Sequence, residues 1–287
     1  MKRLIALLLA LIMLLTLLPQ ITPSANAYVV QSGYCGENLS YVLNYATLTI
    51  SGEGPMYNYS RDNPAPWDNF ALDITHIFIE DGVTTIGDYA FGNTYYYVQE
   101  IQIPDSVTYI GYSAFDGCSN LENIKIPFLG NTADETASLS SFFGRQLKTV
   151  VITGGSKIGS YAFSDCANLT SIQLPESITG IGEYAFEGCT GLTNISIPES
   201  VTDIANNAFK GCINLNSVTF LNAVGWQVKK GNDEVFLKSS LSSPGMAAKY
   251  LREQYCSYTW TRDADKYDDI DIEHDFENNI DNWEELT

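Results

Sequence analysis

The sequence of 287 residues predicts a β-rich solenoid of the α/β class, in which short strands and helical turns form a right-handed coil between two caps. Three observations lead to this prediction. A motif Ile-Gly-x-x-Ala-Phe recurs, and its regular copies are 23 or 24 residues apart. A cysteine and then a leucine follow most copies, each after three residues, and most copies continue into an alternating segment that ends in proline. A fixed period of this size is typical of solenoids.

The motif occurs four times in full and once more with alanine in place of glycine, at Ile86–Phe91, Ile110–Phe115, Ile158–Phe163, Ile181–Phe186 and Ile204–Phe209. In one of the segments that follow, Ile195 and Ile197 alternate as a strand requires and therefore face the same side. Pro198 cannot donate a hydrogen bond to a neighbouring strand, so it ends the strand. No single copy can bury all of its apolar side chains, so successive copies must pack on one another. We expect about six repeats within residues 74–220.

The segments on either side of the repeats carry their own motifs. Those on the N-terminal side are Gly33–Leu39, Leu48–Gly54 and Pro64–Trp67, continued by Ile79–Val83 at the start of the repeats. Those after the repeats are Ala247–Leu251, Tyr255 and Trp260. Together with the repeats, they resemble the BspA-like leucine-rich repeat family of bacterial secreted and surface proteins. The resemblance implies a leucine-rich repeat solenoid with a β-rich N-terminal cap at 28–73 and a C-terminal cap at 221–262. It also implies recognition or adhesion, although a fold alone does not determine function.

The N-terminus has the three parts of a secretory signal peptide. Lys2 and Arg3 precede an apolar run over Leu4–Leu18, and Ala25-Asn26-Ala27 has the form of a cleavage site. We therefore expect residues 1–27 to be removed and the protein to be secreted and extracellular, with association at the cell surface as an alternative. An uncleaved membrane anchor is disfavoured because the run is shorter than the ~20 residues needed to span a bilayer. After cleavage we expect no contact with the membrane.

One repeat is irregular at residues 128–146, where a segment rich in Ser, Thr and acidic residues replaces the motif and Phe142-Phe143 supply the interior aromatic. We interpret this segment as a solvent-exposed loop, with a protrusion that contacts a partner as the alternative.

The last segment, residues 263–287, contains eleven acidic residues and one basic residue. It is predicted to be a solvated, disordered tail. Binding of a divalent ion is the alternative, but the residue order of an EF-hand is missing.

Six cysteines in a secreted protein would ordinarily indicate three disulfides. Four of them occupy the same position in different repeats, namely Cys118, Cys166, Cys189 and Cys212. Thr94 takes that position in the first repeat, and threonine cannot form a disulfide, so we expect these four cysteines to be reduced and inward-facing. Cys35 and Cys256 lie in opposite caps, too far apart to pair. A zinc site is disfavoured because there is no C-x-x-C pair.

Composition and motifs exclude several classes of function. The formal net charge of −19 provides no positive surface for nucleic acid. No metalloprotease, serine-hydrolase or P-loop motif is present, so we expect neither catalysis nor a cofactor nor a metal. The favoured hypothesis is a monomeric recognition protein that binds a protein or polysaccharide ligand. The alternatives are an enzyme or targeting module that acts on carbohydrate or peptide polymers, and a structural spacer.

A binding surface is predicted near the first repeats, where aromatic residues concentrate. His76 and Phe78 are expected to point outward if Ile77 and Ile79 point inward. The other candidates are tyrosines, namely Tyr95, Tyr96, Tyr97, Tyr109 and Tyr112. Tyrosine combines a large apolar face with a hydroxyl group, which suits an interface. The alternative is that these rings pack on the N-terminal cap.

Overall fold

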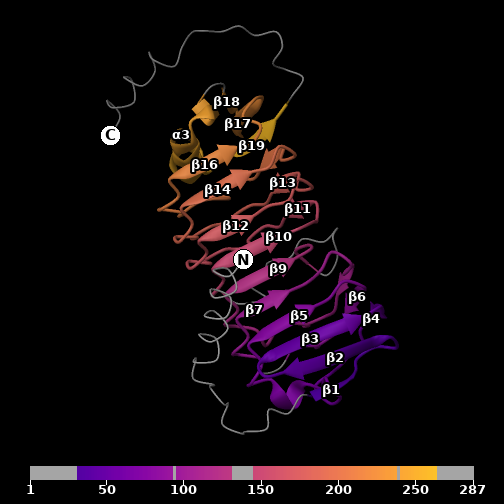
Figure 1. Cartoon of the computed structure of the whole chain (residues 1–287). Helices are drawn as coiled ribbons and strands as arrows, with labels where there is room; N and C mark the ends of the chain where they lie inside the picture. Colours follow the sequence, from indigo (N-terminus) through magenta and orange to yellow (C-terminus); the bar gives the residue numbers. More distant parts are fainter. Residues whose placement is uncertain (1–30, 93–94, 131–144, 238–239, 264–287) are drawn as a thin grey trace, which may run out of the picture.

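The computed structural model describes residues 31–92, 95–130, 145–237 and 240–263, and these form a β-rich leucine-rich repeat solenoid (Figure 1). Each repeat begins with a strand on the same side of the solenoid. These strands are β5 (His76–Ile79), β7 (Glu100–Gln102), β9 (Asn123–Ile126), β10 (Thr149–Ile152), β12 (Ser171–Gln173), β14 (Asn194–Ile197) and β16 (Ser217–Phe220). A second, short strand returns on the other side in β6 (Val83–Ile86), β8 (Tyr109–Ile110), β11 (Lys157–Ile158), β13 (Gly180–Ile181) and β15 (Asp203–Ile204). Five repeats therefore have both strands among the described residues, close to the predicted six.

An eight-stranded sheet extends across the first repeats. It begins with an antiparallel meander of β1 (Gln31–Tyr34), β2 (Leu39–Asn44) and β3 (Thr47–Gly52), and β3 then pairs in parallel with β5. The sheet continues through β7, β9 and β10 to β12. A short strand, β4 (Gly54–Pro55), starts the sheet on the other side by pairing with β6. The N-terminal meander is thus continuous with the repeats, as Figure 1 shows.

The interior is filled by equivalent side chains from successive repeats. The motif phenylalanines stack, with ring centroids 5.2 Å apart for Phe91–Phe115 and Phe163–Phe186 and 5.0 Å apart for Phe186–Phe209. At the N-terminal end, Trp67 continues the stack, 5.6 Å from Phe91. Stacking of this kind buries apolar surface that no single repeat could cover, which is the main source of stability in solenoids.

The glycine of the motif is explained by the close approach of neighbouring repeats. A Cβ atom added to Gly87 would lie 1.9 Å from the carbonyl oxygen of Tyr57 in the preceding segment. At Gly111 and Gly182 the added atom would lie 2.4 and 2.5 Å from backbone nitrogens of the preceding repeat. Only a residue without a side chain lets the backbones come this close.

The residue just before Ala-Phe has a left-handed backbone in every regular copy, although none of these residues is glycine. The five residues have φ between 51° and 59°, and they are Tyr89, Ser113, Tyr161, Tyr184 and Asn207. Residues other than glycine adopt this conformation at a cost of about 1–2 kcal/mol. Packing offsets part of that cost for Tyr161 and Tyr184, whose rings stack with centroids 5.0 Å apart.

The four repeat cysteines face inward and are fully buried, as predicted. The thiols of Cys189 and Cys212 donate hydrogen bonds to the carbonyl oxygens of Phe163 and Phe186, at 3.1 and 3.0 Å. All six cysteines of the chain are free in the structure. Within the described ranges no cluster of three or more His, Cys, Asp or Glu side chains is arranged to hold a metal ion.

The strand ladder is interrupted between β12 and β14. β14 pairs only with β16, in a separate two-stranded sheet, whereas β11, β13 and β15 remain paired across the same repeats. Ile172, the inward residue of β12, is only partly buried, whereas its equivalents Val150 and Val218 are fully buried. The two sides of the solenoid are therefore bonded differently at this point.

The C-terminal residues pack against the last repeat. β19 (Thr259–Arg262) pairs antiparallel with β15, and β17 (Trp226–Lys230) lies between β19 and β18 (Asp233–Phe236). The helix α3 (Pro244–Lys249) packs against β16 and leads directly into a π-helical turn over Tyr250–Gln254. None of the helices in the described part of the chain is long and apolar enough to cross a membrane. The domain boundaries given above stay predictions, because contacts alone do not define them.

Several sequence predictions lie outside the described residues. They concern the signal peptide at 1–27, Thr94, the central part of the irregular segment with Phe142-Phe143, and the acidic tail beyond Asp263.

Candidate binding surface on the strand face

His76 and Phe78 lie on β5 and point outward, while Ile77 and Ile79 are buried. The alternation predicted for this strand is therefore confirmed. The Nδ1 atom of His76 lies 2.7 Å from Oγ1 of Thr75, and its Nε2 atom lies 3.9 Å from the carboxylate of Glu100 on β7. The His76 and Phe78 rings are 6.2 Å apart. Both side chains are half-buried, so they form part of the surface of the sheet.

Tyr95 does not belong to an exposed binding surface, and the alternative, that its ring packs against the N-terminal segment, is confirmed for this residue. Its side chain has no exposed surface, and its ring packs edge-on against Phe91 with centroids 5.8 Å apart. Its hydroxyl group donates a hydrogen bond of 3.0 Å to Oδ1 of Asp68. Burial, and then the nearby Asp68 carboxylate, raise the pKa of the Tyr95 hydroxyl well above its ordinary value. Tyr95 is a core residue because it closes the space between the N-terminal segment and the first repeat.

The remaining tyrosines are exposed, and Tyr109 and Tyr112 lie apart from His76 and Phe78. Tyr109 is on β8, which belongs to the sheet of β4 and β6 on the other side of the solenoid. Tyr112 follows it and packs edge-on against Tyr89 at 5.6 Å. Tyr96 and Tyr97 lie in the turn that precedes β7 and are 49% and 58% exposed. A role for these residues in binding stays a prediction.

Strand register assembles a row of outward side chains that extends from the repeats into the N-terminal meander, and the repeat pattern did not identify the part in the meander. Val42 is paired with Thr49, Thr49 with Phe78, and Phe78 with Gln102, which in turn is paired with Lys125 on β9. We call this row, together with His76 and Glu100, the strand face. Val42 is 38% exposed, so the row begins with apolar side chains at β2 and β5 and becomes polar at β7 and β9.

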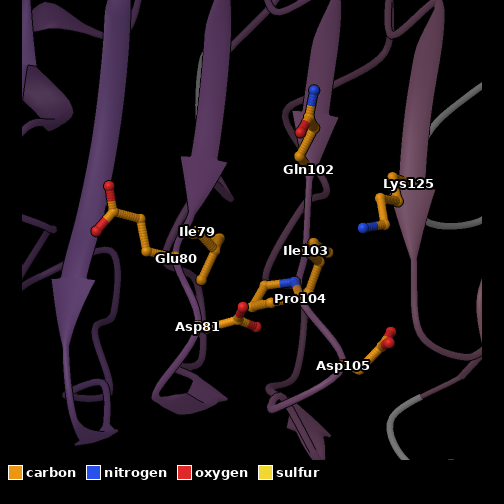
Figure 2. Close-up of a pocket in the computed structure, with 8 residues that line it drawn as sticks. All are labelled: Ile79, Glu80, Asp81, Gln102, Ile103, Pro104, Asp105 and Lys125. Atoms are coloured by element: carbon orange, nitrogen blue, oxygen red, sulfur yellow. The ribbon is translucent and has the colours of Figure 1, made fainter.

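A hollow of about 460 Å³ lies at the lower end of these strands, next to the row (Figure 2). Gln102 and Lys125 belong both to the row and to the lining of the hollow. Glu80 and Asp81 enter the lining directly after β5, and Asp105 enters it after β7. Figure 2 shows the Lys125 side chain extending from β9 toward β7. The hollow thus has three carboxylates and one ammonium group, with a net charge of −2.

The acidic groups around the hollow differ in how they are bonded. Glu100 accepts a hydrogen bond of 2.7 Å from Gln102 and lies near His76, and Asp105 accepts a hydrogen bond from Thr153. Among the described residues, the Glu80 and Asp81 carboxylates have no ion pair and no side-chain hydrogen bond. These two charges are available to a ligand.

The BspA-type leucine-rich repeat profile matches residues 69–137 and 135–255, with six copies. The chain belongs to the BspA-type leucine-rich repeat family. A comparison with curated proteins gave no match. Membership in this family indicates an interaction or adhesion role of the bacterial surface type.

Three solved structures are similar to parts of this BspA-type protein. A leucine-rich cell surface protein from Faecalibacterium prausnitzii is 26% identical, with a TM-score of 0.41, over 73% of this chain and 61% of that chain. A leucine-rich repeat protein from Bacteroides ovatus is 28% identical, with a TM-score of 0.37, over 51% and 40%. A leucine-rich repeat protein from T. pallidum is 23% identical, with a TM-score of 0.37, over 67% and 79%.

Proposed function

We propose that this BspA-type protein is exported and binds a protein ligand on the strand face of its first repeats, without catalysing a reaction. The observation that carries the proposal is the row from Val42 through Phe78 to Gln102 and Lys125, which places apolar side chains beside hydrogen-bonding groups. Protein interfaces combine an apolar centre with a polar rim in this way. In the later repeats the equivalent outward residues are Val151, Gln173, Ser196 and Thr219, none of which is aromatic.

The geometry around His76 favours binding over catalysis, although the residue types there are those of a catalytic triad. Thr75, His76 and Glu100 have the hydroxyl, imidazole and carboxylate of a nucleophilic triad. However, the distance of 3.9 Å between His76 and Glu100 is too long for the hydrogen bond that would orient the imidazole, and the His76 side chain is 39% exposed to competing water. The same three groups can instead donate and accept hydrogen bonds with a ligand.

An immobilised library of 12-residue peptides, probed with the purified protein, tests the proposal. We expect a subset to bind, and we expect Phe78→Ser to weaken that binding about ten-fold or more, because aromatic anchors dominate interface energetics. The matched controls are Leu221→Ser and Val224→Ser, which also remove exposed apolar side chains but lie outside the strand face. Binding that is insensitive to Phe78→Ser contradicts the proposed site.

Two further measurements test the other parts of the proposed function, namely the absence of catalysis and the export of the protein. Mass spectrometry of the bound peptides after incubation should find them intact, and cleavage or modification would contradict a purely binding role. N-terminal sequencing of exported protein should begin at Tyr28, whereas an intact Met1 would contradict the signal peptide.

A further inference from the structure

We infer that the hollow beside the strand face receives one basic side chain of an extended segment of the partner protein, while an apolar side chain of the same segment packs on Phe78. The inference rests on the proposed function and adds the chemical class of the ligand. It is carried by three features of the first repeats: unpaired carboxylates, the size and position of the hollow, and the contrast with later repeats.

Charge complementarity is the first feature. Glu80 and Asp81 have no ion pair within the described ranges, whereas Glu100 and Asp105 already accept hydrogen bonds from the protein itself. A lysine or arginine of a ligand would therefore meet two uncompensated negative charges without breaking an existing contact. Lys125 on the opposite side of the hollow repels a second basic group but can donate a hydrogen bond to a backbone carbonyl of the ligand.

The position of the hollow is the second feature. Its volume of about 460 Å³ leaves room for a long side chain, and Ile79, Ile103 and Pro104 provide apolar lining for the methylene groups of that side chain. Phe78 and Glu80 are two residues apart on the chain. Residues two apart on an extended ligand lie about 6.6 Å apart and point to the same side. A ligand with an apolar residue and a basic residue at positions i and i+2 therefore matches this spacing.

The third feature is a contrast with the later repeats, which have an acidic residue at the same position but no aromatic residue beside it. Glu176 and Glu199 follow proline at the same position as Asp105 does in its repeat. The outward residues that precede them, Gln173 and Ser196, are polar and not aromatic. An acidic side chain at this position is therefore common to the solenoid, whereas its combination with Phe78 and two neighbouring unpaired carboxylates occurs at the first repeats.

Fluorescence anisotropy with matched peptides tests the inference. One peptide carries Leu-x-Lys in an otherwise neutral sequence and the second carries Lys-x-Leu. Each is compared with two counterparts in which glutamine or glutamate replaces the lysine. We expect one of the two lysine peptides to bind. Its glutamine counterpart should bind up to about five-fold more weakly, and its glutamate counterpart more weakly still, because a partly exposed ion pair contributes up to about 1 kcal/mol. Raising the ionic strength to about 0.5 M should reduce the difference.

Two charge-neutralising variants complete the test. Glu80→Gln with Asp81→Asn should weaken the lysine peptide about five- to ten-fold, since two partly exposed charges are lost. Glu176→Gln with Glu199→Gln changes the net charge equally and should leave binding within about two-fold. Circular dichroism melts confirm that each variant is folded. Equal binding of the lysine and glutamine peptides, still dependent on Phe78, would overturn this inference and leave the proposed function intact. No Phe78-dependent binding of any peptide would overturn the proposed function itself.

Discussion

The thiol of Cys212 donates a hydrogen bond of 3.0 Å to the carbonyl oxygen of Phe186, which lies 26 residues earlier in the chain. Cys189 makes the same bond to Phe163 at 3.1 Å. Cys189 and Cys212 therefore each satisfy a buried backbone carbonyl of the preceding repeat, whereas the thiol of Cys118 lies 4.0 Å from the carbonyl oxygen of Phe91. The reactivity and the ionisation of these thiols follow from their buried position.

The six thiols should differ sharply in reactivity. Cys256 is only partly buried, whereas the other five are buried. Iodoacetamide at pH 8 should label Cys256 in the folded protein and all six cysteines in urea, because alkylation requires an accessible thiolate. Peptide mapping by mass spectrometry gives the labelled positions. Rapid labelling of Cys118, Cys166, Cys189 or Cys212 in the folded protein would show that the repeats open readily.

Burial of the thiols also makes stability depend on pH. Burial raises the pKa of Cys166 to about 11 and that of Cys212 to about 12, from an ordinary value of 9.0. For each thiol, the pKa in the folded state lies above the pKa in the unfolded state. The thiol's contribution to the free energy of unfolding is therefore complete below pH 9 and is lost as the pH rises toward the folded-state pKa. The loss is up to about 1.4 kcal/mol per pH unit for each thiol. Urea unfolding at pH 8, 9 and 10 should show this fall, with a smaller slope for Cys212→Ser. Equal stability at all three pH values is the contrary result.

Tyr95 should be essential for stability, unlike its two neighbours. Tyr95→Ser removes a buried ring and its hydrogen bond to Asp68, which should lower the free energy of unfolding by about 3–5 kcal/mol. Tyr96→Ser and Tyr97→Ser change exposed side chains and should stay within about 0.5 kcal/mol. Thermal or urea unfolding of the three single variants makes the comparison. Equal losses at all three positions would contradict the core assignment of Tyr95.

Ser113→Gly should stabilise the protein. Ser113 has φ of 51°, a conformation that glycine adopts without steric cost, and no side-chain hydrogen bond of Ser113 is present in the described structure. We expect a gain of about 0.5–1 kcal/mol, reduced by the greater freedom of glycine in the unfolded chain. Ser217→Gly, in the extended strand β16, is the control and should destabilise. A loss of stability in Ser113→Gly would mean that its side chain contributes more than the strain it causes.

Amide hydrogen exchange should reveal the interruption between β12 and β14. The amides of Ser217 and Thr219 on β16 face β14, with which β16 is paired. The amides of Asn194 and Ser196 on β14 face β12, and no ladder connects these two strands in the described structure. We expect Asn194 and Ser196 to exchange faster than Ser217 and Thr219 by at least about ten-fold, because an unbonded amide near the surface needs no opening reaction. Equal protection of the two strands would show that the ladder is continuous in solution.

Features that follow from the period of a strand could be predicted from the sequence, whereas features that depend on contacts between distant segments could not. The alternation around Ile77 and Ile79 correctly oriented His76 and Phe78, because period two is a property of the strand itself. The three consecutive tyrosines at 95–97 have no such period. The burial of Tyr95 depends on Asp68, which is 27 residues away in sequence.

Two other features could not be predicted for the same reason. Val42 joins Phe78 only through the register of the N-terminal meander with β5, which the repeat pattern does not include. The interruption at β14 has no counterpart in the pattern either, because Ile172 fits the motif as well as Ile195 does.

The cysteine bond that joins the repeats of Cys189 and Cys212 to their preceding repeats also bears on how such a protein evolves. The bond has nearly the same length at Cys189 and at Cys212. A duplicated unit of 23 residues could be inserted between Phe186 and Phe209. Its cysteine would find a phenylalanine carbonyl oxygen in the preceding repeat, and its own phenylalanine carbonyl would accept a bond from the cysteine of the following repeat. The length of the molecule can therefore change by whole units without altering Phe78 or the carboxylates beside it. The length of the solenoid and the composition of the strand face are then free to diverge independently.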